Sequence, residues 1–171
     1  HNYSRTYVVG TEGMKSMLHA QNIETEADNP ELVVVGYDTE LTYEKLVKAS
    51  VFLHQGVPLI ASHPDMVCPS PDGGLPDVGA FLALFEKTTG KKPMHICGKP
   101  NPGMILHKIE SLGLQPEECA MVGDRIYTDM EMAKQARVVS ILVLSGEATL
   151  EDLNDSHEID IIVSSVDKLL R

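Results

Sequence analysis

The stretch Ala120-Met121-Val122-Gly123-Asp124-Arg125-Ile126-Tyr127-Thr128-Asp129 decides how this chain folds. An apolar run that stops at a glycine is typical of a strand in a parallel sheet, so a short buried strand is expected over Ala120 to Val122. Thr128 followed three residues later by Glu131 is a capping-box pattern, which predicts a helix that begins at Asp129.

Asp124 would therefore follow a strand, and Asp129 would lie in the first turn of the next helix. In open α/β sheets, ligands bind in the crevice outside the carboxyl ends of the strands. Two carboxylates at such an edge suggest a hard cation such as Mg²⁺, which prefers oxygen ligands. The purely structural alternative is that Asp129 complements the helix dipole and Asp124 belongs to an ordinary Gly-Asp turn.

The composition is that of a globular chain without a membrane segment. Its 171 residues are enough for one domain, or for a small domain and part of another, and no apolar run has the length of a membrane helix. The net charge of −11 repels polyanions, so nucleic acid is not an expected partner. The three scattered cysteines and the lack of a visible secretory signal predict free thiols and a cytoplasmic location.

Apolar segments and helix-like segments alternate along the chain, which predicts an α/β fold with a mostly parallel sheet. Strands are expected at 6–10, 32–36, 58–61, 94–97, 120–122, 138–144 and 159–163. Helices are expected at 12–20, 42–55, 78–88, 149–154 and 165–170, together with one that starts at Pro102 and one that starts at Asp129. The polar and Pro/Gly-rich segment 68–76 is expected to be a long loop.

The segment Gly98-Lys99-Pro100-Asn101-Pro102 is the second informative stretch. Asn101 is expected to cap a helix that has Pro102 at its first position and Met104, Ile105, Ile109 and Leu112 on its apolar face. Lys99 then lies outside a helix N-terminus, where an ammonium group is useful only if an anion is held. The alternative is an ordinary solvated lysine in a loop.

Three stretches in order, 98–102, 123–129 and 141–146, resemble the phosphatases of the haloacid dehalogenase (HAD) superfamily, in its NagD-like, 4-nitrophenylphosphatase-like branch. Upstream, 33–46 and 60–65 look like the cap domain of that branch, so the resemblance spans nearly the whole chain. It implies a Rossmann-like HAD core with an inserted α/β cap. Residues 1–95 would form the cap, and residues 96–171 the C-terminal half of the core.

The resemblance also implies a Mg²⁺-dependent hydrolase that acts on a small phosphorylated metabolite through an aspartyl-phosphate intermediate. Lys99 matches the lysine that neutralises the nucleophile and the phosphoryl oxygens. Asp124 matches the acid that holds Mg²⁺, and Asp129 the second acid, which assists the metal site or orients the lysine. These roles agree with the demand of phosphoryl transfer for positioning and charge neutralisation.

The chain departs from this family in its first motif, because no Asp-x-Asp occurs in it. We therefore expect the nucleophilic aspartate in an upstream segment that is missing here, and this chain alone to be inactive. Loss of the nucleophile's strand would leave the strand at 120–122 with an unpaired edge. Arg137 stands where glycine is usual, so it would be strained in a left-handed conformation.

Two other interpretations of the protein's function stay open. One is a receiver-like signalling domain that accepts phosphate without turnover, and the other is a catalytically inactive fragment or binding module. Within the cap, Ser62, His63 and Asp65, with the loop that follows, are candidates for substrate binding. Their alternative is an ordinary turn after a strand. Dimers formed through the cap are frequent among similar proteins, so a homodimer is a further expectation.

Overall fold

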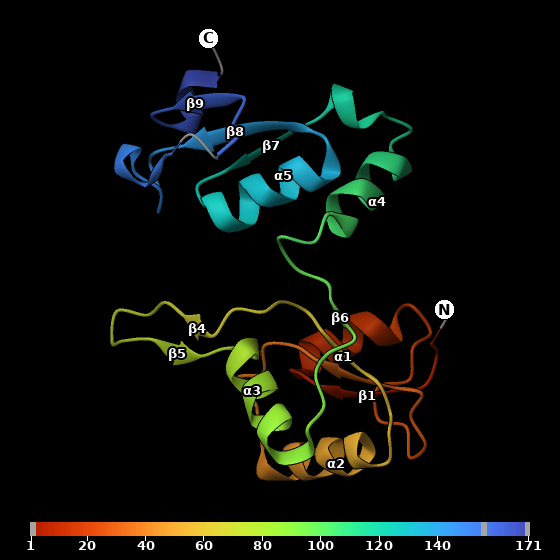
Figure 1. Cartoon of the computed structure of the whole chain (residues 1–171). Coiled ribbons are helices and arrows are strands. Elements are labelled where there is room, and N and C mark those ends of the chain that lie inside the picture. Colours follow the sequence, from red (N-terminus) through yellow and green to blue (C-terminus); the bar gives the residue numbers. More distant parts are fainter. Residues whose placement is uncertain (1–2, 155–156, 170–171) are drawn as a thin grey trace. The chain divides into compact units, whose positions relative to one another are not determined.

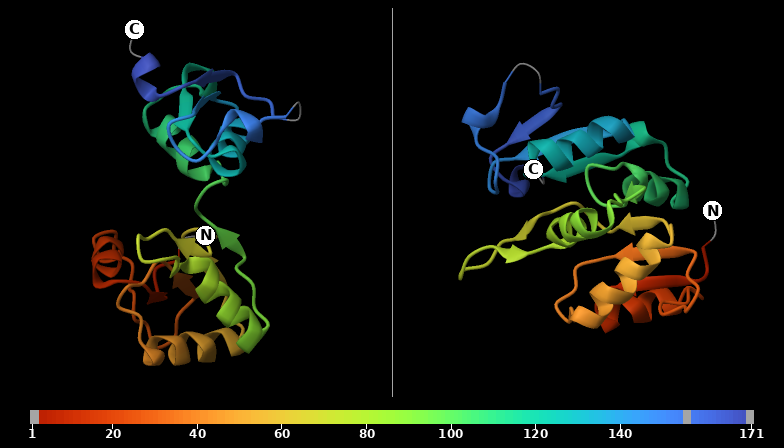
Figure 2. Two further views of the ribbon diagram at one scale, coloured as in Figure 1. Left: turned by 90° about the vertical axis from the view of Figure 1, so that its left-hand side faces the viewer. Right: turned by 60° about the horizontal axis from the view of Figure 1, so that its bottom comes forward.

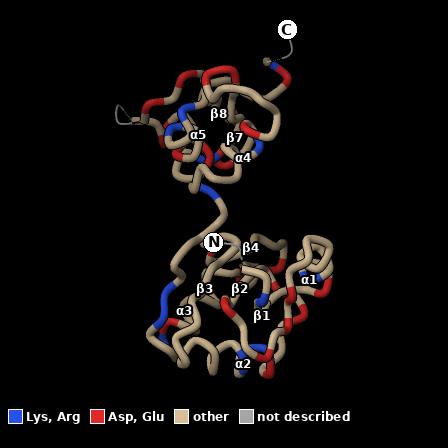
Figure 3. The backbone as a smooth tube through the Cα atoms, turned by 90° about the vertical axis from the view of Figure 1, so that its right-hand side faces the viewer, with Lys and Arg blue, Asp and Glu red and all other residues tan. Residues whose placement is uncertain are grey.

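The computed structural model describes residues 3–154 and 157–169 and divides into two compact units, His1–Gly98 and Lys99–Arg171 (Figure 1). Both units combine parallel strands with helices, so the predicted α/β fold class is confirmed. No helix within the described residues is both long enough and apolar enough to cross a membrane. Acidic positions are scattered over both units with few basic ones between them (Figure 3), as the net charge predicts.

The first unit is built on a four-stranded parallel sheet in the order β1-β2-β3-β6. Its strands are β1 (Thr6–Val9), β2 (Leu32–Val35), β3 (Leu59–Ala61) and β6 (His95–Ile96). The central strands are apolar and rich in β-branched residues because both of their faces are covered. All four run in one direction, so their carboxyl ends lie along one edge of the sheet.

Three helices belong to this sheet: α1 (Glu12–His19), α2 (Tyr43–His54) and α3 (Val78–Thr89). The Thr42 hydroxyl caps α2, and Gly90 ends α3 in the left-handed conformation. Helices α2 and α3 bury their apolar sides against one face of the sheet, whereas α1 lies on the other side (Figures 1 and 2). In α3, Phe81, Leu82 and Phe85 are buried, whereas the side chain of Leu84 is exposed.

The segment 68–76 is not an irregular loop as predicted. It connects β4 (Val67–Cys68) to β5 (Leu75–Pro76), which pair antiparallel as a short two-stranded ribbon. The prediction missed the ribbon because each strand has only two residues, too few for a periodic pattern, and one of them ends in proline.

The second unit contains a three-stranded parallel sheet in the order β7-β8-β9. Its strands are β7 (Ala120–Gly123), β8 (Val139–Val143) and β9 (Ile161–Val163). Helices α4 (Gly103–Ser111) and α5 (Glu131–Ala136) pack together with Cys119 and Met121 in one apolar cluster. Single 3-10 turns occur at η1 (Pro116–Glu118), η3 (Leu150–Asp152) and η4 (Val166–Leu169).

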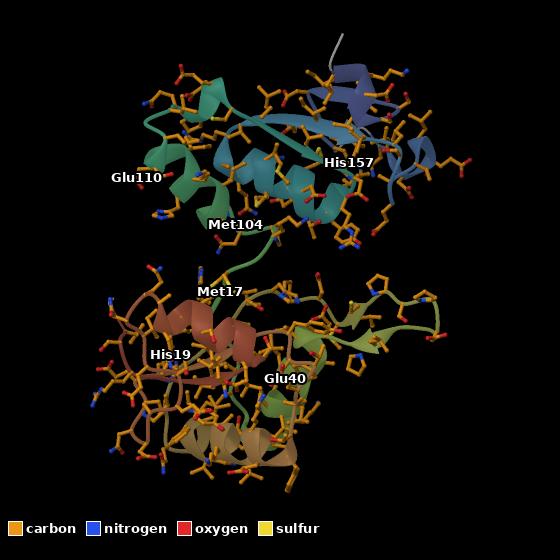
Figure 4. The ribbon with its side chains drawn as sticks, turned by 180° about the vertical axis from the view of Figure 1, so that it is seen from behind. Met17, His19, Glu40, Met104, Glu110 and His157 are labelled. Atoms are coloured by element: carbon orange, nitrogen blue, oxygen red, sulfur yellow. The ribbon has the colours of Figure 1, made fainter. Side chains whose placement is uncertain are left out.

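Two of these turns replace predicted helices, at 149–154 and at 165–170, although residue 170 lies outside the described part of the chain. Helix α4 begins at Gly103, one residue later than predicted, so Pro102 and not Asn101 is at the N-cap position; Asn101 Oδ1 nevertheless accepts a hydrogen bond from the Gly103 backbone 2.8 Å away. The apolar face of α4 is only partly buried: Ile109 is in the core, but Met104 and Leu112 are exposed. Met104 lies at the start of the helix, and the labelled Glu110 lies toward its other end (Figure 4).

Strand β7 is also less buried than predicted, since Ala120 and Val122 are exposed. The physical reason is that β7 pairs with β8 along one edge, and within residues 3–154 and 157–169 no strand pairs with its other edge. An apolar run indicates a strand suited to burial, but burial itself depends on neighbours that the run does not specify.

Candidate functional site

The carboxyl ends of β7 and β8 bring two loops of the second unit together. The first loop starts at Asp124, directly after Gly123 ends β7. One Asp124 carboxylate oxygen, Oδ2, accepts a hydrogen bond from the Glu147 backbone at 2.9 Å, and the Asp124 carbonyl accepts one from Ala148 at 3.0 Å. The parallel register therefore holds the Asp124 carboxylate at the edge of the sheet where α/β folds bind ligands.

Asp129 connects this loop to Lys99, although the two residues are 30 positions apart in the chain. The Lys99 ammonium lies 2.6 Å from Asp129 Oδ1. The other oxygen, Oδ2, accepts hydrogen bonds from the backbone of Asp124 at 3.3 Å and of Arg125 at 3.2 Å. Because only 2 % of the Asp129 side chain is exposed, these three donors satisfy a charge that is almost completely buried.

The helix that carries Asp129 begins earlier than predicted. A π-helical turn, η2 (Ile126–Met130), precedes α5, and the backbone N–H groups of Asp129 and Met130 both donate to the Arg125 carbonyl. The proposed capping box at Thr128 is therefore wrong: the Thr128 hydroxyl is buried and has no hydrogen-bond partner within the described residues. The Asp129 carboxylate reaches back to the preceding N–H groups and so stabilises an earlier start.

Two glycines allow the two carboxylates to approach the backbone this closely. A Cβ atom on Gly123 would lie 2.3 Å from the Asp129 Cβ atom, and one on Gly146 would lie 2.1 Å from Asp124 Oδ2. Neither position can therefore carry a side chain unless the carboxylate beside it moves. The need for these glycines comes from close packing and not from a positive φ angle.

The donor set of this site suits a hard divalent cation. Asp124 Oδ1 has no hydrogen bond or ion pair with any residue of 3–154 or 157–169, and the side chain is only half-buried. Carboxylate oxygen with open space for water is the environment in which Mg²⁺ is usually held. The sequence-predicted residues Lys99, Asp124 and Asp129 thus lie together at one end of the second unit.

A cavity of about 300 Å³ opens beside Asp124. It is lined by Asp124, Arg125, Ile126, Tyr127, Glu147, Ala148, Asp152 and His157. Arg125 Nε is 2.7 Å from Glu147 Oε2, and the Tyr127 hydroxyl donates to the other oxygen of Glu147. The labelled His157 projects from the segment ahead of β9 (Figure 4). The lining also carries the carboxylate of Asp152, whose pKa is lowered by hydrogen bonds from the Thr149 hydroxyl and backbone.

Sequence reasoning did not single out Glu147, Tyr127 or His157. The available signal was positional: Glu147 follows the predicted strand at 138–144, so it had to lie at the same sheet edge as Asp124. His157 comes from a segment without periodic pattern, and nothing in the sequence indicated its place beside the cavity.

The cap candidates Ser62, His63 and Asp65 lie in the first unit, directly after β3. Ser62 Oγ is 2.8 Å from His63 Nδ1, and His63 Nε2 is 2.8 Å from Asp77 Oδ1. The same Asp77 oxygen accepts a hydrogen bond from the Val78 backbone at the start of α3. Asp77 was not predicted as a member of this group, because it is 14 residues from His63 and its only local signal is that of a helix cap.

The chain is similar in sequence and in structure to proteins that are named phosphatases. Residues 96–169 match a family model for HAD-like hydrolases. The chain is 38% identical over 141 residues to a dihydroxyacetone phosphatase of Corynebacterium glutamicum, covering 82% of this chain and 50% of that protein. It is 34% identical over 152 residues to an acid sugar phosphatase of Staphylococcus aureus, covering 88% of this chain and 58% of that protein.

Solved structures give the same result. A 4-nitrophenylphosphatase from Thermotoga maritima superposes with a TM-score of 0.90 at 43% sequence identity, over 98% of this chain and 64% of that one. NagD from Escherichia coli K-12 has a TM-score of 0.87 at 31% identity, over 96% of this chain and 65% of that one. The chain thus spans between half and two thirds of the length of these relatives.

Proposed function

Because this chain belongs to the HAD superfamily, in its NagD-like and 4-nitrophenylphosphatase-like branch, we propose that its residues serve in the Mg²⁺-dependent hydrolysis of phosphate monoesters. The observation that carries this proposal is the assembly of Lys99, Asp129 and Asp124 at one sheet edge, with Lys99 and Asp129 in a 2.6 Å ion pair. Phosphoryl transfer requires positioned positive charge more than covalent chemistry, and this edge can provide it.

Within this proposal, Asp124 holds the cation through its free Oδ1 atom, and Asp129 acts chiefly by orienting Lys99, since Asp129 already receives three hydrogen bonds. When bound, Mg²⁺ neutralises charge on the phosphoryl oxygens. Lys99, whose side chain is 39% exposed, keeps donors free for the same oxygens while Asp129 holds its ammonium in place.

The proposed reaction has two displacements at phosphorus. A carboxylate oxygen of an aspartate forms a bond to phosphorus as the bond to the ester oxygen breaks, and the alcohol leaves. Water then attacks the aspartyl-phosphate, which releases inorganic phosphate and regenerates the carboxylate. Neither step changes an oxidation state, and Lys99 stabilises the phosphoryl charge in both.

We assign the attacking aspartate to a segment that precedes these residues in the complete enzyme. Three observations support this: the chain contains no Asp-x-Asp, it covers 64% of the Thermotoga maritima structure, and the outer edge of β7 has no partner strand within the described residues. A strand added at that edge would cover Val122 and place its own carboxyl end beside Asp124.

The first unit, corresponding to predicted residues 1–95, serves as the cap in this proposal, and residues 96–171 as the second part of the core. Ser62, His63 and Asp65 are the proposed contacts for the organic part of the substrate. The names of the relatives, an acid sugar phosphatase and a dihydroxyacetone phosphatase, favour a small phosphorylated sugar or a related metabolite. Cytoplasmic location and a homodimer formed through the cap belong to the same proposal.

The test is steady-state hydrolysis of 4-nitrophenyl phosphate by the complete enzyme, with and without Mg²⁺. We expect turnover that depends on Mg²⁺ and falls by at least about a hundredfold in Asp124→Asn and in Lys99→Ala, as is usual when electrostatic stabilisation of a transition state is removed. The 171-residue chain alone should show none. Incorporation of phosphate without turnover would favour a receiver-like domain, and neither incorporation nor turnover would favour an inactive binding module.

A further inference from the structure

A second cluster of metal-binding side chains lies in the first unit, apart from the site of Lys99 and Asp124. One ligand atom each from His63, Asp65 and Asp77 falls within 4.8 Å of the others. His63 and Asp65 follow β3, whereas Asp77 caps the N-terminus of α3. Imidazole and two carboxylates on two separate segments form a mixed donor set of the kind that transition metals occupy.

Backbone hydrogen bonds hold the two segments together. The Gly79 N–H donates to the Asp65 carbonyl at 2.7 Å, and the Asp77 N–H donates to the Met66 carbonyl at 3.1 Å. The positions of the three donors therefore depend on main-chain contacts and not on flexible side chains alone. Little conformational entropy would be lost when they converge further on an ion.

The ring of His63 is also oriented for ligation. Its Nε2 atom lies 2.8 Å from Asp77 Oδ1, which as a carboxylate oxygen accepts the Nε2 proton. A metal ion would replace that proton, and Nδ1, 2.8 Å from Ser62 Oγ, would then carry the remaining ring proton and donate to the hydroxyl. A metal-bound histidine usually has such a partner on its second nitrogen, which sets the tautomer and the ring orientation.

The charge balance of the cluster favours a cation. Asp77 is 93% buried but pairs with no lysine or arginine within the described residues, and Asp65 has no side-chain partner there. Among residues 3–154 and 157–169, His63 is thus the only side chain that can offer positive charge to these two carboxylates, and it does so only when it is protonated. A divalent ion would compensate both carboxylates at once.

We propose that His63, Asp65 and Asp77 bind a divalent transition-metal ion of the Zn²⁺ class through His63 Nε2 and one oxygen of each carboxylate. The imidazole ligand distinguishes this site from the all-oxygen site expected for Mg²⁺ at Asp124. The bound ion would tie the segment after β3 to the start of α3. Its binding needs neither the missing segment nor a phosphate ester, so it can be measured independently of the proposed hydrolase reaction, in which His63 and Asp65 are also the proposed substrate contacts.

The test is titration of the 171-residue chain with Co²⁺ in excess Mg²⁺, monitored by visible absorption of the cobalt ion and by the shift of the melting temperature. We expect one Co²⁺ per chain. Asp65→Asn should weaken binding at least about tenfold and His63→Ala more strongly, by analogy with the 10–100-fold losses seen when even indirect metal partners are removed. Asp65→Asn is the cleaner variant, since the exposed Asp65 side chain makes no hydrogen bond or ion pair within the described residues.

The matched controls are Asp72→Asn and His54→Gln, which remove an exposed acid and an exposed histidine of the same unit. Both should bind Co²⁺ like the parent chain. Equal affinity in Asp65→Asn, His63→Ala and the controls would overturn the proposal, as would the intense charge-transfer band of a cobalt thiolate, which would place the ion on a cysteine.

Discussion

The ion pair between Lys99 and Asp129 should contribute a coupling free energy of about 1–2 kcal/mol to the stability of the second unit. Exposed ion pairs give about 0.2–1 kcal/mol, whereas breaking a buried pair costs about 3–5 kcal/mol. This pair is intermediate, because 2 % of the Asp129 side chain but 39% of the Lys99 side chain is exposed. The two backbone donors to Asp129 Oδ2 also keep part of the stabilisation when Lys99 is removed.

The measurement is a double-mutant cycle with Lys99→Met, Asp129→Asn and the double variant, with each free energy of unfolding taken from urea denaturation. Lys99→Met alone should lose more than Asp129→Asn alone, because it leaves a buried carboxylate without its cation. The second unit contains a matched control: Lys134 and Glu158 form an ion pair of 2.8 Å, but both side chains are more than half exposed. Its cycle should give a clearly smaller coupling energy than the cycle of Lys99 and Asp129, because solvent screens an exposed pair.

Equal coupling energies for the two pairs would refute the reasoning, since their distances are similar and only their burial differs. A coupling energy near zero for Lys99 and Asp129 would mean that the two side chains do not meet in solution. In that case the proposed phosphoryl site would lose its main support.

Three further changes test other features of the second unit. Arg137 has φ 58° and ψ 36°, so Arg137→Gly should raise the free energy of unfolding by about 0.5–1 kcal/mol in urea denaturation, whereas Arg137→Ala, which keeps the strain, should not. Gly123→Ala should lower the free energy of unfolding by about 1–3 kcal/mol in the same assay, because the new Cβ atom would overlap Asp129. An unchanged free energy of unfolding would contradict the close packing. Hydrogen bonds from the backbone and hydroxyl of Ser140 lower the pKa of Asp160. This carboxylate therefore stabilises the fold above its unfolded pKa of about 3.9, and the stabilisation is lost as the pH falls through its lower folded pKa. The melting temperature of Ser140→Ala should therefore change less between neutral and acid pH than the melting temperature of the parent chain.

Much of the fold could be predicted from the sequence because its signals are local. An apolar run closed by glycine indicated the strand before Asp124, and Asn101 indicated a nearby helix start, where its Oδ1 accepts a hydrogen bond from the Gly103 backbone. The strain predicted for Arg137 in a left-handed conformation rests on the same kind of signal, and its backbone does adopt that conformation. Each of these features depends on a few neighbouring residues, so periodicity and cap chemistry are sufficient to find it.

The tertiary structure alone decided which of these local features meet. Both the Thr128 hydroxyl and the Asp129 carboxylate could have accepted hydrogen bonds from N–H groups at this helix start. The carboxylate accepts them, because leaving a buried charge without partners costs more free energy than leaving a buried hydroxyl without one. Pairing of Asp129 with Lys99, and of His63 with Asp77, joins residues 30 and 14 positions apart. Sequence separations of this size follow no periodic pattern, because the order and direction of the strands determine which distant residues meet.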